Sequence, residues 1–563
     1  MREEIPEEAR QILAAYPELQ QKLLWHRGIK TADDAVIFLS PDYERDLHDP
    51  FEIHDMGRAV ERILSAIDTQ EKIIVYGDYD ADGIPGSVVL YDFFKKIGYQ
   101  NFSNYIPHRY REGYSLNNQA IEKFAGDSVG LVITVDSGIT DVKEVARANE
   151  LGVDIIITDH HLPLVDEKGA QILPKAYAVI NSKKDACEYQ FDKLCGAGTA
   201  FKLVQALLLK RNFGLPKGWE KWLLDVVGIS TIADMVPLVG ENRALAHFGL
   251  KVLRKSPRLG LQALLKKLRV NQNYLSEEDI GFTIAPRINA ASRIGEPIDA
   301  FELLATSDLS RAGVLAEHLN HLNDQRKGKV AAIVREAKKR LSEREIREVI
   351  VIGDPEWMPG ILGLVANSLA EAHSRPVFVW GREGSVEIKG SCRSSNDVSI
   401  VDLMSQAPQG TFLDLGGHHD AGGFSIAQEK IHTLEDDLIS AYHALESKET
   451  EQKIICDTKL SLDDITEDLY RQIDRLAPFG IDNPKPVFLL ENIPVARVEK
   501  FGKAKEHLKL VFQNGRGDIS AISFFSAGKW NINDGDTITL AASLEKSFFG
   551  GRAELRLRVI DVV

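Results

Sequence analysis

Cysteine is scarce in this chain: its 563 residues include four cysteines, and none of them forms a C-x-x-C pair. They are Cys187, Cys195, Cys392 and Cys456. A disulfide framework or a zinc knuckle is therefore not expected, and a reducing cytoplasm is the natural setting. Long apolar runs are also missing, since none approaches the ~18 residues that a membrane helix needs. The first six residues lack the basic-then-apolar pattern of a secretory signal, so we expect neither membrane insertion nor secretion.

An excess of positive charge is absent as well. The chain has 68 Lys and Arg against 83 Asp and Glu, which gives a net charge of −15. This balance argues against a protein that simply coats nucleic acid, so a polyanion would have to meet local basic patches. One such patch lies between Lys251 and Val270, which include seven lysines and arginines and no acidic residue. A solvated helix face and a nucleic-acid track are equally good interpretations of it.

Short apolar segments that end in acidic loops are the most informative feature present. Three runs rich in Val and Ile, at residues 72–76, 131–135 and 155–158, predict buried parallel strands. The loops that follow them are Asp78-Tyr-Asp-Ala-Asp-Gly83, Asp136-Ser-Gly-Ile and Asp159-His-His161. Ligands of an open α/β sheet bind at the carboxyl ends of its strands. We therefore expect the three loops to converge on one crevice.

This concentration of carboxylates predicts a metal site, because like charges held close together repel unless a cation joins them. Asp80 and Asp82 could face one side of an extended loop and serve adjacent ions, and Asp136 could bridge them. His160 adds a nitrogen ligand, which suits Mn²⁺ better than Mg²⁺. Asp234 stands in an otherwise apolar stretch, where a buried carboxylate without a partner would be costly.

The remaining pattern predicts the architecture. Apolar residues recur at helical spacing from about 310 to 345, which indicates a long helix between two lobes. A second α/β unit starts at residues 348–352, and short alternating segments after residue 452 predict an OB-like β-barrel. The predicted fold class is α/β, with two α/β lobes joined by a long helix and a C-terminal OB-like barrel.

The three acidic loops resemble the signature loops of the DHH phosphoesterases, and four further stretches resemble the RecJ branch of that family. These stretches are Ile106-Pro-His-Arg-Tyr-Arg-Glu-Gly-Tyr114, Ala285-Pro-Arg-Ile-Asn-Ala290, Gly390-Ser-Cys-Arg393 and Gly416-Gly-His-His-Asp-Ala-Gly-Gly423. The resemblance covers nearly the whole chain. It implies an N-terminal helical segment (1–70), a DHH catalytic domain (71–240), a helical connector (241–345), a DHHA1 domain (346–448) and an OB-like nucleic-acid-binding domain (453–563).

The resemblance implies a 5′→3′ exonuclease that degrades single-stranded DNA to 5′-mononucleotides by two-metal phosphodiester hydrolysis, in DNA recombination and repair. Two Mn²⁺ or Mg²⁺ ions would be bound by Asp80, Asp82, Asp136, His160 and Asp234. Asp136 would bridge the ions and act with His160 and His161 in catalysis. The implied partners are single-stranded DNA, a single-strand-binding protein and a helicase, and the protein is expected to be a monomer.

Substrate contacts are also implied by the matching stretches. Arg109, Ser391 and Arg393 would form a pocket for the terminal 5′ phosphate, since the planar arginine fork suits phosphate oxygens. Arg287 and Asn289 are further candidates, which we expect to hold the neighbouring backbone. Gly417 and His418 belong to the glycine-rich loop of the DHHA1 domain, whose backbone N–H groups would approach the substrate phosphates.

Three positions depart from the family pattern: Tyr76, Pro85 and Ser292. Related pyrophosphatases have a histidine at the position of Tyr76, so one metal would have fewer protein ligands here. Two other functions are considered: a DHH phosphodiesterase acting on short oligonucleotides or nucleotide bisphosphates, and a non-catalytic DNA-binding scaffold. The C-terminal barrel favours a polymeric substrate over the first, and the five intact candidate ligands favour an enzyme over the second.

Overall fold

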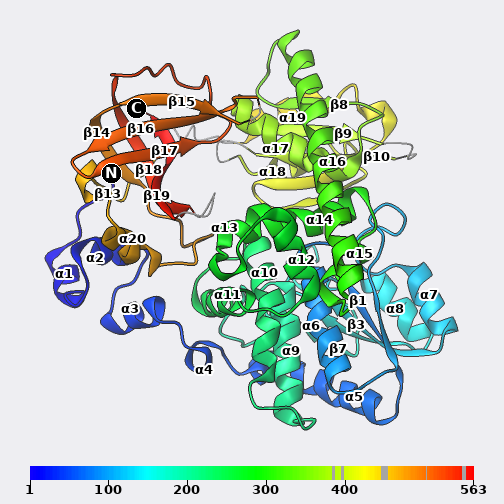
Figure 1. Cartoon of the computed structure of the whole chain (residues 1–563). Helices are drawn as coiled ribbons and strands as arrows, with labels where there is room; N and C mark the ends of the chain where they lie inside the picture. The colour runs from blue at the N-terminus through cyan, green and yellow to red at the C-terminus, as the bar shows by residue number, and fades with distance from the viewer. Residues whose placement is uncertain (383–386, 395–397, 446–453, 503, 548–552, 563) are drawn as a thin grey trace.

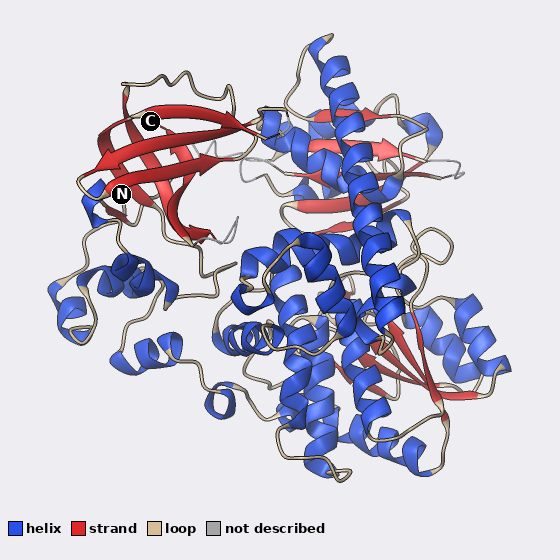
Figure 2. Cartoon of the chain, in the orientation of Figure 1, coloured by secondary structure: helices blue, strands red, loops and turns tan. Residues whose placement is uncertain are grey.

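The computed structural model describes residues 1–563 except 383–386, 395–397, 446–453, 503, 548–552 and 563. Two α/β lobes are stacked along the long helix α16 (Leu309–Ser342), and a β-rich C-terminal domain lies to one side of them (Figures 1 and 2). The fold class predicted from the sequence is confirmed. The expected boundary at 448–453 lies outside the described residues. Among the described helices, none combines the length and the apolar character that crossing a bilayer requires.

The first lobe is built on a parallel five-stranded sheet with the order β2-β1-β3-β4-β7. Its strands are β1 (Lys72–Gly77), β2 (Phe102–Tyr105), β3 (Val129–Val135), β4 (Asp154–Thr158) and β7 (Ala178–Ile180). Helices α5 (Met56–Asp68), α6 (Gly83–Lys96) and α9 (Gly196–Lys210) cover one face, and α7 (Asn118–Gly126) and α8 (Val142–Glu150) cover the other. The chain moves from β1 to one side for β2 and to the other side for β3, so the strand order switches between β1 and β3. The carboxyl ends of these two strands are therefore the expected ligand site.

A helical connector packs between this sheet and α16. It contains α10 (Leu224–Ala233), α11 (Gly240–Leu253), α12 (Leu259–Leu268), α14 (Ala285–Ile294) and α15 (Ile298–Ala305). Two arginines of the basic patch at 251–270, Arg254 and Arg258, are used here as structural groups. Arg258 pairs with Asp225 and Asp92, and Arg254 donates to the carbonyl of Leu275. Two of the seven basic residues are therefore engaged inside the connector, while Lys251, Lys255, Lys266, Lys267 and Arg269 are exposed on its surface.

The second lobe has a five-stranded sheet with the order β11-β12-β10-β9-β8. Its strands are β8 (Ile350–Gly353), β9 (Val377–Gly381), β10 (Ile388–Arg393), β11 (Asp414–Gly417) and β12 (Ala421–Ile426). Helix α17 (Leu362–His373) and the end of α16 cover one face, while α18 (Ile400–Ser405) and α19 (Leu434–Ala444) cover the other. Ser391 and Arg393 therefore lie on a central strand of this lobe.

The C-terminal domain is a seven-stranded sheet with the order β13-β14-β18-β19-β17-β16-β15. Its strands are β13 (Thr458–Lys459), β14 (Phe488–Pro494), β15 (Arg497–Phe501), β16 (His507–Asn514), β17 (Gly517–Ser523), β18 (Thr537–Ser547) and β19 (Glu554–Val562). Within the described residues, no strand pairing joins β13 to β15, so the sheet is OB-like without being closed into a barrel by hydrogen bonds.

The two ends of the chain share one hydrophobic core. Helices α1 (Glu7–Ile12), α2 (Glu18–Trp25) and α3 (Ala32–Leu39) lie beside α20 (Glu467–Asp474) under the C-terminal sheet (Figure 1). Leu23, Leu24 and Phe38 are buried in the same cluster as Leu476 and Phe488. The first 39 residues thus form part of the C-terminal domain, whereas α4 (Tyr43–Asp46) and α5 pack on the first lobe.

Arg243 on α11 connects this domain to the connector. Its buried guanidinium donates to the carbonyl of Phe38 at 2.7 Å and to those of Leu476 and Ala477 at 3.0 Å. Burial lowers the pKa of Arg243 to about 9. A single side chain therefore joins the N-terminal helices, the connector and the C-terminal domain.

Candidate metal centre and phosphate site

The three acidic loops begin at one level of the first sheet. The backbone N–H groups of Asp78, Asp136 and Asp159 each donate to the last residue of the neighbouring strand, at 3.1, 2.9 and 3.1 Å. Each loop therefore continues the sheet by one residue before it leaves it. The side chains that follow are brought together at the reversal point between β1 and β3, as the sequence predicted.

Asp82 is the most firmly held carboxylate of the cluster. It precedes α6 and accepts hydrogen bonds from the N–H groups of Gly196 (2.6 Å) and Ala197 (2.8 Å), at the start of α9. The hydroxyl of Ser230 donates to the same carboxylate. A Cβ atom on Gly196 would lie 2.4 Å from Cβ of Asp136, so only glycine lets α9 approach this closely. The positive end of a helix thus fixes one side of the site.

His160 stands at the centre of the cluster. Its Nε2 atom lies 3.1 Å from Oδ1 of Asp136, 3.6 Å from Oδ2 of Asp82 and 3.7 Å from Oδ2 of Asp234. Ligand atoms come within 4.8 Å of one another in three groups. These groups are Asp78, Asp80 and Asp136; Asp82, His160 and Asp234; and Asp136, His160 and His161. Asp136 and His160 each belong to two groups.

The donor set fits divalent cations. Among the described residues, Oδ1 of Asp78, Oδ1 of Asp136 and both ring nitrogens of His160 are buried without a hydrogen-bond partner. Burial, followed by the charges of neighbouring aspartates, raises the pKa of Asp136 well above its usual range. Burial lowers the pKa of His160 to about 4, which keeps the imidazole neutral and able to donate a lone pair. Carboxylates with neutral imidazole are suitable ligands for Mn²⁺, and bound cations would relieve the repulsion.

Asp159 and His161 lie next to the cluster and make different contacts. Oδ1 of Asp159 accepts from the N–H groups of His160 and His161, and Oδ2 accepts from that of Ile139, so Asp159 shapes the loop. Nδ1 of His161 lies 2.8 Å from Oδ1 of Asp159. Burial lowers the pKa of His161, but its hydrogen bond to Asp159 and the surrounding negative charges outweigh this and bring it to about 9. His161 is therefore a partly exposed side chain beside the candidate metal ligands, and its pKa favours the protonated form.

Sequence reasoning missed Asp78 as a candidate ligand. Its carboxyl is buried beside Asp80 and Asp136, and burial together with the charge of Asp80 raises its pKa well above the usual range. The available signal was its position as the first residue after a buried strand. Tyr76 points away from the cluster, because its hydroxyl donates to the carbonyl of Ser115 at 2.7 Å. Asp78 thus lies in the cluster, whereas the side chain of Tyr76 does not.

The other two departures are accommodated locally. Pro85 lies in the first turn of α6, where backbone N–H groups have no hydrogen-bond acceptor within the helix. Ser292 is buried in α14, and its hydroxyl donates to the carbonyl of Asn289 at 3.1 Å. Neither residue disturbs the acidic loops.

A group of arginines lies where the two lobes meet. Arg109 stands 5.2 Å from the ring of Tyr79, and Arg393 donates to the carbonyl of Cys392 (2.7 Å) and the hydroxyl of Ser391 (3.3 Å). Arg293, which sequence reasoning missed, donates to the carbonyl of Gly360 at 2.8 Å across the lobes. The signal for it was its position three residues after the Ala285–Ala290 stretch.

These arginines repel one another, which indicates an anionic ligand. Burial, followed by the charges of Arg109 and Arg326, lowers the pKa of Arg293 to about 10, and Arg393 acts in the same direction. Within the part of the chain that is described, Arg109, Arg293 and Arg393 form no ion pair with a carboxylate. Asp80 contributes an opposing charge to Arg293, so this arginine stands close to a candidate metal ligand. Phosphate is the anion that arginine forks bind most specifically.

The other predicted substrate-binding residues lie outside this group of arginines. Arg287 donates to the carbonyl of Thr283 (2.7 Å) and to Asn320 (3.2 Å), and Oδ1 of Asn289 accepts from the N–H group of Ala81 (2.9 Å). Both side chains thus hydrogen-bond to backbone groups. The group bound by Asn289 belongs to the acidic loop that contains Asp80 and Asp82. Gly417 and His418 lie on an exposed hairpin, where the N–H of His418 bonds to Ala421 at 2.8 Å. No hydrogen bond or ion pair between described residues joins this hairpin to the acidic cluster.

Comparison with known families identifies the first lobe, the second lobe and the C-terminal domain. The chain matches the models of the DHH family N-terminal domain at residues 72–231, the DHHA1 domain at 346–444 and the RecJ OB domain at 456–561. Among curated relatives, the single-stranded-DNA-specific exonuclease RecJ of Bacillus subtilis is 36% identical over 96% of this chain and 67% of its own. The protein of the same name from Haemophilus influenzae is 30% identical over 91% of both chains.

Solved structures agree with these matches. The crystal structure of RecJ from Thermus thermophilus in complex with Mn²⁺ superposes with a TM-score of 0.80 at 27% identity, over 99% of this chain and 78% of that one. A structure of exonuclease RecJ bound to manganese is 33% identical, with a TM-score of 0.59 over 70% of this chain and 96% of that one. The likeness extends through both lobes and the C-terminal domain, and the chain belongs to the RecJ family of DHH phosphoesterases.

Proposed function

We propose that this protein is a metal-dependent 5′→3′ exonuclease that removes 5′-mononucleotides from single-stranded DNA. The observation that supports it best is the buried group of aspartates around His160. It lies beside a group of arginines that form no ion pair with any described carboxylate, at the meeting of two lobes. The first group suits divalent cations, and the second suits a phosphate. The resemblance to RecJ further suggests recombination and repair in the cytoplasm, as a monomer beside a single-strand-binding protein and a helicase.

Two Mn²⁺ or Mg²⁺ ions would be held by two of the three groups of ligand atoms. Asp78 and Asp80 would contribute to one ion, together with Asp136, and Asp82 and Asp234 to the other, together with His160. Asp136 and His160 connect the two groups, since Oδ1 of Asp136 lies 3.1 Å from Nε2 of His160. Bound cations would lower the pKa of a water nucleophile and neutralise charge that develops on the phosphoryl oxygens. Asp78 thus extends the ligand set that the sequence predicted.

The chain's own residues would orient the substrate. His161 carries a positive charge at the edge of the cluster and is placed to bind a non-bridging oxygen of the scissile phosphodiester. Arg393, Arg293 and Ser391 would bind the terminal 5′ phosphate, which carries more negative charge than an internal diester. Because that pocket lies close to Asp80, cleavage would occur near the 5′ end of the strand. We assign Arg287 and Asn289 to positioning of the neighbouring backbone, and Gly417 and His418 to substrate contact.

Single-stranded DNA labelled at either end tests this function. With Mn²⁺, we expect mononucleotides to be released from the 5′ end first, and full-length strands labelled at the 3′ end to shorten one nucleotide at a time. Release from the 3′ end would contradict the polarity. Turnover confined to di- and trinucleotides would instead support an oligonucleotide phosphodiesterase, and DNA binding without any hydrolysis would support a scaffold. The C-terminal domain favours the polymeric substrate, since OB-like domains bind single strands.

A further inference from the structure

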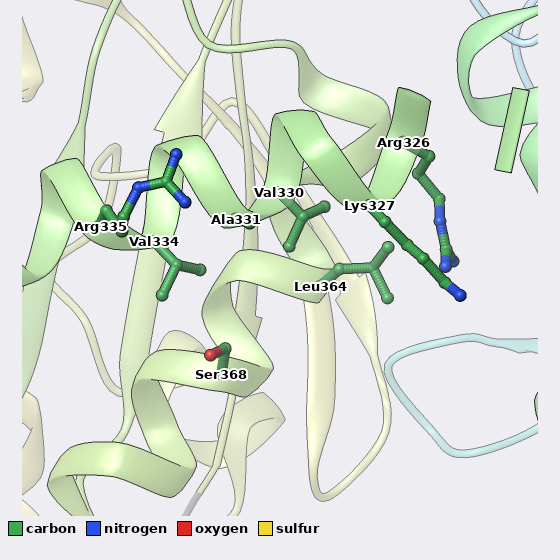
Figure 3. A pocket seen from close by; sticks show the side chains of 8 residues that line it. All are labelled: Arg326, Lys327, Val330, Ala331, Val334, Arg335, Leu364 and Ser368. Carbon is green, nitrogen blue, oxygen red and sulfur yellow. The ribbon is translucent and has the colours of Figure 1, made fainter. Parts of the chain in front are cut away.

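A groove with its own basic residues runs between α16 and α17. Its volume is about 490 Å³, within the usual range for small-molecule sites. Val330, Val334 and Leu364 line its middle, and Arg326, Lys327 and Arg335 are its cations. Figure 3 shows Arg326 and Lys327 extending together at one end, with Arg335 near the other. Among the described residues that line the groove, none is acidic.

These cations lack the acidic partners that other arginines of the same helix have. Arg311 pairs with Glu302, and Arg340 pairs with Glu336 and Asp354. Between described residues, no ion pair involves Arg326, Lys327 or Arg335, and Nε of Arg326 is buried without a hydrogen-bond partner. In a chain with 83 acidic and 68 basic residues, three cations without ion pairs around one apolar groove indicate an anionic ligand.

The groove starts beside the arginines at the meeting of the lobes. Leu364, which lines it, follows Gly363, where an added Cβ atom would lie 3.0 Å from Nη2 of Arg393. Arg293 donates to the carbonyl of Gly360, just before the same helix α17, at 2.8 Å. A strand whose terminal phosphate is held by Arg293 and Arg393 ends there. The part of the substrate that can reach the neighbouring groove is therefore the nucleotide that cleavage has released.

We propose that this groove binds a nucleoside 5′-monophosphate, the product of the reaction, on its way out of the enzyme. The phosphate would be bound by Arg326 and Lys327, and the base would lie on Val330 and Leu364. An apolar surface flanked by cations matches a flat base joined to a dianion. This inference rests on the proposed function for the source of the nucleotide, but the binding site itself can be tested without hydrolysis.

Calorimetric titration of the full chain with thymidine 5′-monophosphate in EDTA tests the site. The titrations use the Arg393→Ala background, so that binding at the lobe junction is weakened. There we expect Lys327→Glu to lower the affinity by about ten-fold or more, since a charge-assisted hydrogen bond is replaced by repulsion. Lys329→Glu is the matched control, because Lys329 is exposed on the same helix and does not line the groove. Thymidine and inorganic phosphate should each bind more weakly than the nucleotide.

The same variants give a second measurement during hydrolysis. Added thymidine 5′-monophosphate should inhibit the protein, and the inhibition constant should rise by about ten-fold in Lys327→Glu but not in Lys329→Glu. Equal nucleotide affinity in both variants would overturn the inference. A loss of affinity for an acidic peptide or for long single strands, with nucleotide binding unchanged, would also overturn it and assign the groove to that partner. Nucleotide binding in a protein that hydrolyses no DNA would support the groove while refuting the proposed function.

Discussion

The Nε2 atom of His160 lies 3.1 Å from Oδ1 of Asp136, and the two atoms do not form a hydrogen bond with each other. Both are buried, and His160 is kept neutral by burial. Two lone-pair donors this close together can bind one cation from adjacent coordination positions. The relationship therefore singles out Asp136 as the ligand whose removal should affect the site most.

Asp136→Ala is expected to lower kcat by roughly three orders of magnitude, because bound cations supply several kcal/mol of charge stabilisation in such reactions. Single-turnover cleavage of 5′-phosphorylated single-stranded DNA measures this. The exposed Asp127→Ala serves as the control and should behave like the unmodified protein. Near-normal turnover in a folded Asp136→Ala protein would refute the assignment of Asp136 to the metals.

Metal binding should also be visible in the stability of the protein. Without cations, the ionised form of Asp136 opposes folding because it is buried among other carboxylates. Asp136→Asn is therefore expected to raise the melting temperature in EDTA. Mn²⁺ should raise the melting temperature of the unmodified protein considerably and that of the variant only slightly. A variant that is less stable than the unmodified protein in EDTA, or that gains equally from Mn²⁺, would contradict this account.

Arg393→Ala should lower activity on 5′-phosphorylated strands by about 10- to 100-fold, the usual effect of losing a charge-assisted hydrogen bond. It should also reduce the difference between 5′-phosphate and 5′-hydroxyl substrates, and Arg293→Ala should do the same. Arg375→Ala on the same lobe is a suitable control. If either variant keeps the full preference for a 5′ phosphate, the end of the strand is bound elsewhere.

Asn289 is expected to act on the reaction without touching the substrate. Its Oδ1 accepts from the N–H group of Ala81, between Asp80 and Asp82, so Asn289→Ala frees the loop that carries these ligands. We expect kcat to fall about 10- to 100-fold, as small misplacements of reacting groups typically cause. The affinity for DNA in EDTA should stay the same, and the Mn²⁺ requirement should rise. A loss of DNA affinity with kcat unchanged would instead show that Asn289 contacts the substrate.

The C-terminal domain cannot be removed alone without exposing the N-terminal helices. Leu23, Leu24 and Phe38 would lose their core in a protein ending at residue 444, and we expect that protein to aggregate. A protein of residues 41–444 should stay monomeric and keep the metal centre. It should bind long single strands more weakly, with a smaller loss on very short oligonucleotides. An equal loss on both would mean that the domain supports folding and does not capture substrate.

Much of the fold could be predicted because it is local. Val and Ile runs placed β1, β3 and β4 to within two residues, and helical spacing placed a long helix at about 310–345, where α16 spans 309–342. The acidic loops followed from these strands, since parallel strands end at the same edge. Arg293 could not be found in this way, because it becomes important only when the two lobes meet. The shared core of the two chain ends was equally hidden, since hydrophobic periodicity does not show which element covers a face.

That shared core affects the order in which the protein can mature. Arg2 pairs with Asp457, 455 positions later, so the first helices leave the ribosome long before their partners exist. Both lobes and the connector are complete once residue 444 has been made, and they contain the whole metal centre. At ~5–20 residues per second, the ribosome needs roughly 6–24 s more to deliver the C-terminal domain. During that interval the nascent chain already carries the carboxylates of the candidate metal centre, while Leu24 and Phe38 remain uncovered and vulnerable to aggregation or to capture by a chaperone.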